Sequence, residues 1–447
     1  MNAERHRNGR VTATPAPGHL PYRPVRVVDM ELTAPGEFLA PGRQEHIRPR
    51  GKVLALVRAH GHPVGMVTAD ATDPHTLWQV LARTAEREYG TRTAGRPAYD
   101  AGHLRSTPSG DPRGTSDLPD ISVIVATRNR PDLLRQCLDS LLAMDYPPSR
   151  FEVIVVDNAP SDDATERMLL ARRDGRVRYV REPVAGLARA HNRGLAAAHG
   201  RIAAFTDDDT LVDRGWLTAL ADTFSDDRRI GCVTGLIVPA ELETEAQAAL
   251  ERHGGFGKGF LPRTWSLQAP PSDPLFPFAA GHFGSGANMA FRTEVLSALG
   301  GFDPATGTGT PAFGGDDLLA FFRVIATGGV LAYRPDAIVW HRHRRTEEAL
   351  RAQAFGYGAG FGAYLTGALA HEPRMLPALV RRMPRGIRYA TARARDRTGD
   401  PAVGRSRQLA LLEVRGLLYG PMGYLRSRRL SVRHDGRPAR RRARSRS

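Results

Sequence analysis

The sequence predicts an α/β fold, with a mostly parallel sheet and helices on both of its faces. Three apolar runs, at 121–126, 151–156 and 202–205, have the unbroken hydrophobic character of strands that are buried on both sides. Helical patterns follow these runs, and this alternation is typical of parallel strands joined by crossover helices. Each run also ends in a polar cluster, so we expect a binding site at the carboxyl edge of the sheet.

The other elements of this domain follow from local signals. Pro131 stands at a favoured first-turn position, and Leu134, Cys137, Leu138 and Leu141 recur on one face of the helix that it opens. The remaining expected elements are a helix at 164–172 capped from 161–163, a strand at 177–180, helices at 185–199, 214–224 and 318–326, and a strand-like run at 337–340. The stretch at 236–281 breaks into glycine, proline and aromatic residues, and we interpret it as a long loop of the acceptor-binding region.

Composition divides the 447-residue chain into several regions, since it is too long for one ordinary core. The boundaries that we expect are a disordered N-terminus at 1–20, a small α+β accessory domain at 21–89, a linker at 90–119, the main domain at 120–345, a basic helical region at 346–430 and a disordered basic tail at 431–447.

Charge and cysteine content limit the class of protein. The formal net charge is +16, nearly all of it from arginine, and the basic tail could contact nucleic acid or anionic lipid or simply be solvated. The two cysteines, Cys137 and Cys232, make a disulfide framework improbable and fit a reducing compartment. The first 24 residues contain no apolar leader-like stretch, so we expect a cytoplasmic protein, with a peripheral position on the inner face of the cell membrane as an option.

An acidic triplet, Asp207-Asp208-Asp209, directly follows the apolar run at 202–205. Three neighbouring carboxylates repel one another, so a site that holds them usually supplies a cation, and an Asp-x-Asp pair suits Mg²⁺ or Mn²⁺. The alternative is an acidic turn that caps the helix at 214–224. Because polar clusters at 127–130 and 157–158 end the neighbouring strands in the same way, the metal site is favoured.

At this point the chain resembles a known family. The motifs SVIVATRNR at 122–130, VVDN at 155–158 and AAFTDDDT at 203–210 resemble the nucleotide-binding half of family 2 glycosyltransferases, the inverting enzymes of GT-A fold, here of a bacterial type with extensions at both ends. The resemblance continues through GANMAFR at 286–292, GGFD at 300–303 and GGDDL at 314–318. Neither a glycine-rich dinucleotide fingerprint nor a phosphate-loop lysine follows the first strand, which argues against NAD-binding and ATPase functions.

The resemblance implies a role for each polar cluster. Asp157 would accept a hydrogen bond from a nucleobase N–H, since a carboxylate is only an acceptor. Asp209 would bind the metal, and Asp207 would hold the ribose or complete the metal shell. The full set of expected nucleotide-sugar contacts is Thr127, Asn129, Arg130, Asp157, Arg189, Asn192, Asp207 and Asp208. His191 stands where the family usually has Arg, which leaves open whether Arg189 or Arg193 approaches the donor.

The resemblance also implies a catalytic base. The family places it in a Glu-Asp pair, and this chain has Asp316-Asp317, so Asp317 would be the base and Asp316 would replace the Glu. The alternative is a glycine loop with an acidic helix cap. A histidine often completes the metal site, and His341 and His343 lie on the same side of an extended segment. Either could serve, and we favour His341.

The C-terminal region allows two interpretations. The stretch at 352–370 has no charge and is long enough to cross a bilayer, but its five glycines lower hydrophobicity and helix propensity, so packing on the main domain is favoured. The stretches at 376–392 and 409–430 mix Leu, Tyr and Met with Arg. They could lie on an anionic membrane surface or cover the sheet as amphipathic helices.

The expected function is therefore metal-dependent transfer of a sugar, with inversion, from a UDP-, GDP- or dTDP-sugar to an acceptor hydroxyl. The expected cofactor is Mn²⁺ or Mg²⁺, and the acceptor could be a glycan, a lipid-linked molecule or a small molecule. No specific nucleic acid partner is expected. The alternatives are a sugar-1-phosphate nucleotidyltransferase and a non-enzymatic protein that binds membrane or nucleic acid through its basic end.

Overall fold

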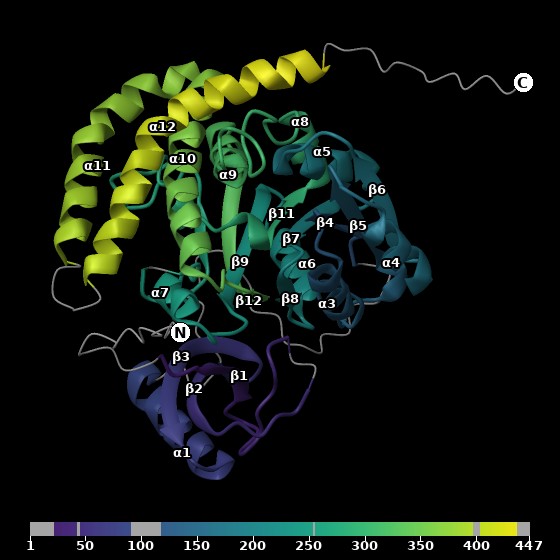
Figure 1. Ribbon diagram of the computed structural model, residues 1–447, viewed down its shortest axis with the longest axis vertical. Coiled ribbons are helices and arrows are strands. Elements are labelled where there is room, and N and C mark those ends of the chain that lie inside the picture. Colours follow the sequence, from purple (N-terminus) through teal and green to yellow (C-terminus); the bar gives the residue numbers. More distant parts are fainter. Residues whose placement is uncertain (1–21, 43–44, 91–117, 254, 397–402, 436–447) are drawn as a thin grey trace, which may run out of the picture.

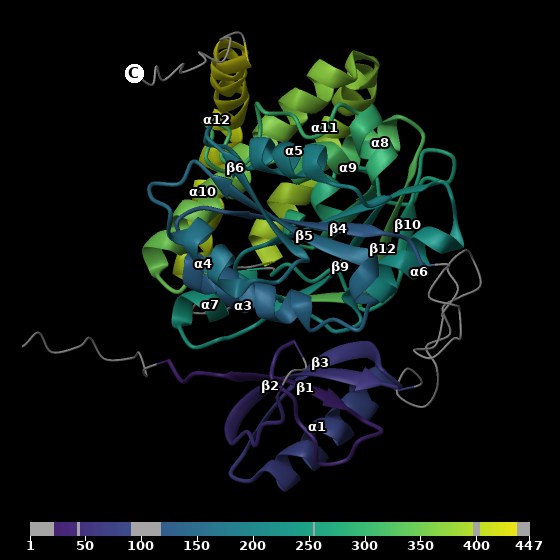
Figure 2. The same cartoon turned by 90° about the vertical axis from the view of Figure 1, so that its right-hand side faces the viewer.

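The computed structural model describes residues 22–42, 45–90, 118–253, 255–396 and 403–435 (Figure 1). The expected N-terminal segment at 1–20, nearly all of the expected linker and the end of the basic tail therefore lie outside the described residues. Three parts are visible: a small N-terminal unit, a central sheet with helices on both faces, and a group of long C-terminal helices (Figures 1 and 2). The predicted α/β architecture, with its helical C-terminal region, is confirmed.

The N-terminal unit is a three-stranded sheet covered by one helix. Its elements are β1 Arg26–Glu31, β2 Gly51–Ala59, β3 His62–Ala71 and α1 Pro74–Tyr89. Strand β2 pairs parallel with β1 and antiparallel with β3. Helix α1 begins where the side chain of Asp73 accepts a hydrogen bond from the Thr76 amide, with Pro74 at its first turn.

This unit is docked on the central sheet through a shared core and a buried charge. Arg58 is 2% exposed and pairs with Asp29 of its own sheet at 2.8 Å and with Asp213 of the central domain at 2.5 Å. Removing one partner would leave a buried charge uncompensated, so the bridge ties the two parts together. The apolar residues that surround the contact are Val27, Leu56, Leu236, Val238, Leu242, Ile338 and Trp340.

The central sheet is mixed, with strand order β10-β12-β9-β11-β7-β4-β5-β6 and β8 paired to β12. Strands β7, β4, β5 and β6 are parallel, as expected, while β11 lies antiparallel between β9 and β7. The strands are β4 Ile121–Thr127, β5 Phe151–Asn158, β6 Val177–Glu182, β7 Ile202–Asp207, β8 Thr210–Val212, β9 Ile230–Pro239, β10 Arg263–Trp265, β11 Met289–Arg292 and β12 Val330–His341.

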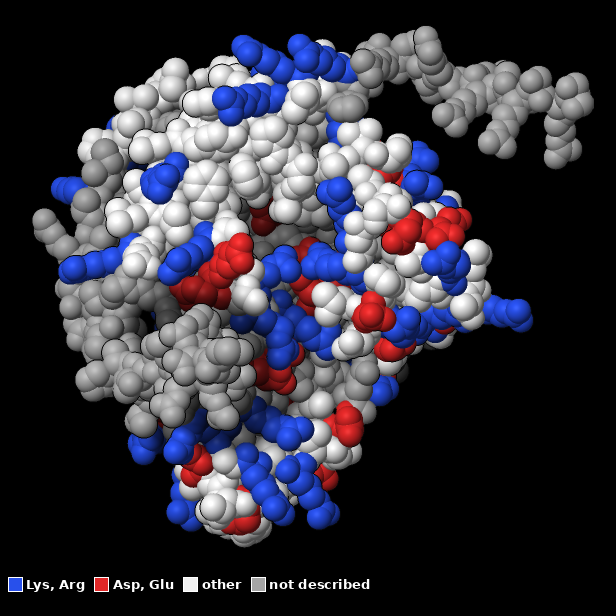
Figure 3. Space-filling model, in the orientation of Figure 1, with Lys and Arg blue, Asp and Glu red and all other residues white. Residues whose placement is uncertain are grey.

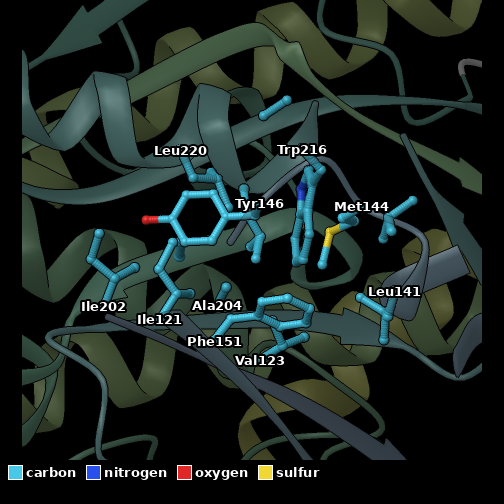
Figure 4. Close-up of a cluster of buried hydrophobic side chains, with 14 of the residues drawn as sticks. Ile121, Val123, Leu141, Met144, Tyr146, Phe151, Ile202, Ala204, Trp216 and Leu220 are labelled. Atoms are coloured by element: carbon cyan, nitrogen blue, oxygen red, sulfur yellow. The ribbon is translucent and has the colours of Figure 1, made fainter. Parts of the chain in front are cut away.

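Helices cover both faces of this sheet (Figure 2). On one side lie α3 Pro131–Leu142, α4 Ala164–Arg172 and α6 Trp216–Asp226, and on the other lie α5 Leu187–Ala197, α8 Thr293–Ala298 and α9 Asp316–Ala326. Successive strand residues point to opposite faces, so Val123 packs in the first core while Ile124 packs in the second. The first core includes Phe151 and Trp216 (Figure 4).

The prediction of a long loop at 236–281 is partly wrong, because this stretch contains regular structure. Strand β9 runs on to Pro239, helix α7 spans Glu245–His253, and the short edge strand β10 pairs with β12. Helix α7 was not evident from the sequence because it is short and its buried residues are three alanines, a glutamine and one leucine, a weak hydrophobic signal. Its position matters for the site described below.

The C-terminal region consists of α10 Glu347–His371, α11 Leu376–Asp396 and α12 Val403–Asp435. Helix α12 includes the first five residues, 431–435, of the expected basic tail. A Cβ on Gly358 of α10 would overlap the carbonyl oxygen of Glu413, so glycine permits α10 and α12 to touch backbone to backbone. Gly315, with φ +87°, likewise lies against Gly360 of α10. Within the described part of the chain, no helix combines the length and apolar character needed to traverse a bilayer.

Candidate active site

Three neighbouring strands end at one level and bring their polar residues together. In the parallel pairing Thr127 of β4 lies opposite Asp157 of β5, and Ala126 lies opposite Asp207 of β7. The register of the strands therefore places the predicted clusters along one edge of the sheet. In the space-filling view, basic and acidic side chains lie together in a recess on this side of the molecule (Figure 3).

The acidic turn and the end of β12 form a candidate metal site. One ligand atom each from Asp207, Asp209 and His341 lies within 4.8 Å of the others. The Nε2 atom of His341 is 3.4 Å from Oδ1 of Asp209, and this buried oxygen has no hydrogen-bond partner. The backbone amide of Arg342 donates to the carbonyl of Asp209 at 3.0 Å, which fixes the end of β12 against the turn.

The electrostatics of the turn favour a cation. Burial and repulsion from Asp209 and Asp208 raise the pKa of Asp207 to about 8, and burial raises the pKa of Asp208 to about 6. Burial also opposes ionisation of Asp209, whereas the positive charges of Arg130 and Arg344 favour it, and the pKa of Asp209 lies below its usual value. Burial lowers the pKa of His341 to about 4, so its ring is neutral and can offer a lone pair. Two carboxylates and a neutral imidazole fit Mn²⁺, and also Mg²⁺ if water completes the shell.

Two arginines, Arg130 after β4 and Arg344 after β12, approach the carboxylates of the acidic turn. Arg130 pairs with Oδ1 of Asp208 at 2.7 Å and with Oδ2 of Asp209 at 3.1 Å, and Arg344 lies 3.7 Å from the same Asp209 oxygen. Thr127 donates to the other oxygen of Asp208 at 2.7 Å. Asp208 is fully buried, and its carboxylate is held between Thr127 and Arg130; the contact of these residues with a nucleotide sugar stays a prediction.

Two histidines and a glutamate form a hydrogen-bonded chain that starts at the candidate metal site. The Nδ1 atoms of His341 and His343 are 3.2 Å apart, and Nε2 of His343 is 2.6 Å from Oε1 of Glu251 in α7. A hydrogen bond between two Nδ1 atoms needs one protonated and one bare nitrogen. If His341 offers a bare Nε2 to a cation, its proton lies on Nδ1, and the remaining proton of His343 points to Glu251. Phe256 packs against both rings.

The candidate base lies at the start of α9. The Oδ2 atom of Asp317 accepts from the Gly286 amide and Oδ1 accepts from the Leu318 amide, both at 2.8 Å. Burial, and then the charge of Asp316, raise the pKa of Asp317 to about 6. Asp316 is 4% exposed and lies 3.4 Å from Nδ1 of His191, so it faces the interior.

A short link connects this base to the acidic turn. Thr206 of β7 donates to the Ala287 carbonyl at 2.8 Å, next to the Gly286 amide that holds Asp317. Asp317 and the strand that leads to the candidate metal site therefore both bond to the same short turn at 286–288.

The expected nucleobase contact is placed at the end of β5. Asp157 is buried and accepts from the Tyr179 hydroxyl at 3.2 Å, while its Oδ1 atom has no hydrogen-bond partner. Burial raises the pKa of this carboxyl group. Asn129, at φ +55°, accepts from the Ser161 amide at 3.0 Å and joins the β4 loop to the β5 loop. One carboxylate oxygen of Asp157 is thus buried and without a hydrogen-bond partner, and its contact with a base N–H stays a prediction.

Two of the expected donor contacts, Asn192 and Arg189, have hydrogen-bond partners within the protein. The side-chain amide of Asn192 donates to the Phe302 carbonyl and accepts from the Phe302 amide, both at 2.8 Å, so this side chain holds the GGFD turn. Arg189 donates to the Ser431 carbonyl of α12 at 3.4 Å. The Asn192 amide is thus engaged within the domain and Arg189 reaches α12, and the contact of either residue with the donor stays a prediction.

Sequence reasoning missed Glu251, Tyr179 and Arg344. Glu251 lies in the stretch that lacked a recognisable pattern, and its partner His343 is 92 positions away. Tyr179 is one strand over from Asp157, a pairing that depends on strand order. Arg344 is one of several arginines in its segment, with no local signal that singles it out.

Comparison with known proteins finds similarity to glycosyltransferases. Residues 122–300 match the family model described as glycosyl transferase family 2. The chain is 33% identical over 113 residues to glycosyltransferase AglE of Haloferax volcanii, covering 25% of this chain and 37% of that one. It is 26% identical over 263 residues to the pre-mycofactocin glycosyltransferase of Mycobacterium tuberculosis, covering 58% and 50%. The chain thus spans half or less of the length of these curated relatives.

Among solved structures, the mannosyltransferase PcManGT from Pyrobaculum calidifontis, in complex with GDP-Man and Mn²⁺, aligns with 75% of this chain and 92% of its own. The TM-score is 0.46 at 21% identity.

Proposed function

On the premise that residues 122–300 are a glycosyl transferase family 2 domain with a GT-A-like α/β fold, we propose that this protein transfers a sugar from a nucleoside-diphosphate sugar to an acceptor hydroxyl, with inversion. The observation that carries the proposal is the convergence of Asp207, Asp209 and His341 at the sheet edge that also holds Asp157, with Asp317 anchored beside them.

Each residue has a task in this proposal. Asp157 accepts from the nucleobase, and Asp207, Asp209 and His341 hold a divalent cation. Such a cation, when bound, neutralises charge on the departing diphosphate. Asp317 accepts the proton of the acceptor hydroxyl as that oxygen bonds to the sugar carbon from the side opposite the diphosphate. With a pKa near 6 the carboxyl is mostly ionised at neutral pH yet still basic enough to take a proton.

The test is thermal unfolding of the full chain with UDP, GDP or dTDP, each with and without Mn²⁺. A ligand at 100 times its Kd stabilises the folded state by about 2.7 kcal/mol. We expect one of these nucleotides to raise Tm when Mn²⁺ is present and to have little effect in EDTA. Equal stabilisation with and without metal, or none with any nucleotide, would contradict the proposal. A nucleotidyltransferase would instead respond to a nucleoside triphosphate together with a sugar 1-phosphate.

We propose further that Glu251 is a positioning residue, which sets the proton arrangement of His343 and His341. Replacing Glu251 with Ala should weaken Mn²⁺ binding about 10- to 100-fold, a typical loss for a residue that orients a metal-ligating histidine. Isothermal titration with Mn²⁺ measures this directly. The Mn²⁺ affinity of Glu251→Gln should lie between those of the wild type and Glu251→Ala, because the glutamine amide oxygen still accepts from Nε2 of His343.

The matched control is Glu243→Ala, which removes a half-exposed carboxylate paired with Arg345 near the same helix. It should leave Mn²⁺ affinity unchanged. If Glu251→Ala binds Mn²⁺ as tightly as the wild type does, the two histidines need no carboxylate behind them and the positioning role is refuted.

A further inference from the structure

Helix α12 has two apolar faces, and one of them is turned outward. Its inner face packs on α10 through Leu409, Gly416, Gly420 and Tyr424, among others. The outward apolar residues, with their exposed fractions, are Leu411 64%, Val414 53%, Leu418 76%, Met422 50%, Leu425 51% and Val432 67%. At 3.6 residues per turn these six side chains fall within roughly a quarter of the helix circumference. We define them as the outer stripe.

Basic side chains accompany the outer stripe. By helical spacing Arg429 lies within it, and Arg415, Arg426 and Arg433 lie along one border. Glu413, the acidic residue of α12 whose side chain is described, turns inward and pairs with His253 at 2.8 Å. Among the described side chains of α12, the outward face therefore combines apolar and positive groups without a carboxylate.

This combination identifies the kind of partner. Single exposed leucines are ordinary, but a continuous apolar stripe marks a surface that something covers. A second copy of the chain would bring guanidinium groups of like charge together in a symmetric pairing, which is unfavourable. An anionic bilayer surface accepts both features, because apolar side chains enter the headgroup region while arginines pair with lipid phosphates.

Helix α12 is also hydrogen-bonded to the loop that precedes Asp317. Tyr424 donates to Asp303 at 2.9 Å and Ser431 donates to the Pro304 carbonyl at 3.2 Å, both in the loop that leads to Asp317. In Figure 1, α12 crosses the near side of the molecule, and the recess in Figure 3 opens on that same side. A surface bound to α12 would thus lie beside the mouth of the candidate site.

We propose that the outer stripe of α12 binds the surface of an anionic membrane and holds the protein there peripherally. A helix with this pattern lies in the plane of the interface instead of crossing it. The binding itself does not depend on the sugar-transfer reaction. If the proposed function also holds, the membrane position would bring lipid-linked acceptors to the site.

The test is co-sedimentation of the full chain with vesicles of phosphatidylcholine alone or with phosphatidylglycerol added. The wild type should sediment with the anionic vesicles and remain in solution with the neutral ones. Replacing both Leu418 and Leu425 with Gln removes apolar area without changing charge, and should weaken binding at least tenfold. Leu170→Gln on α4, a leucine that is 70% exposed elsewhere, should bind as the wild type does.

Two results would overturn the proposal. One is an absence of wild-type binding to anionic vesicles, or equal binding by the double variant, which would assign any membrane contact to other basic residues. The other is a dimer, detected by light scattering, that the double variant converts to a monomer while vesicle binding is absent, which would make the stripe a self-association surface. All substituted side chains are exposed, so unfolding curves should coincide and separate these results from misfolding.

Discussion

Replacing Asp317 with Asn is expected to lower kcat for sugar transfer by about 100- to 10,000-fold, the range associated with the loss of a general base. Asparagine has the same shape but cannot take the acceptor proton. Its amide oxygen can still accept from one of the two amides, Gly286 or Leu318, that hold the carboxylate. Donor binding should therefore survive, and calorimetric titration with the preferred nucleotide and Mn²⁺ would check this beside the steady-state rate.

The pH dependence provides a second measurement on the same residue. Burial and the charge of Asp316 raise the pKa of Asp317 to about 6, so its protonated, inactive form persists to a higher pH than for an ordinary aspartate. The wild-type rate should rise as pH increases through about 6, and Asp317→Asn should lack that rise. Asp139→Asn, at an exposed carboxylate on α3, is the matched control and should behave as the wild type does. A rate that is flat between pH 5 and 8, or an active Asp317→Asn, would exclude this base.

The part of the site that could be predicted lies where local pattern and sheet topology coincide. Asp157, Asp207 and Asp209 each follow an apolar strand directly, and parallel strands bring their carboxyl ends to one edge. The prediction of Asp317 as the base comes from the resemblance to family 2 glycosyltransferases, because glycine and acidic residues before an apolar helix are equally typical of a helix cap. The predicted boundaries of the helix at 164–172 are confirmed, because the signals that start and end this helix are local.

The rest depended on contacts that a linear pattern does not encode. Glu251 reaches His343 only because α7 folds against the end of β12. Asn192 stands in a family-like motif, yet its amide is satisfied by Phe302, which is 110 positions away. The glycines of α10 lower its hydrophobicity, and their reason is the close approach of α12 and of the loop that precedes Asp317. Such features follow from tertiary packing, which overrides local propensity.

Asp209→Asn and Asp207→Asn are both expected to abolish stabilisation by Mn²⁺ and to lower turnover at least about 100-fold. A metal ion supplies several kcal/mol of charge stabilisation in the transition state, and about 1.4 kcal/mol corresponds to a factor of ten in rate. Each substitution replaces one of the two carboxylates that approach His341. Metal binding is measured by titration with Mn²⁺, and turnover is measured at saturating donor.

Without metal the two variants should shift stability in opposite directions, which distinguishes a cation site from an ordinary polar turn. The pKa of Asp209 is lowered in the folded state, so its ionised form favours folding above pH 4, and Asn loses that contribution. The pKa of Asp207 is raised to about 8, so its ionisation opposes folding, and the penalty grows between about pH 4 and pH 8. In EDTA at pH 8, Tm should fall for Asp209→Asn and rise for Asp207→Asn. If both variants kept the Mn²⁺-dependent rise in Tm, or both lost stability in EDTA, these carboxylates would not form a metal site, and the negative charge concentrated at this edge would need another explanation.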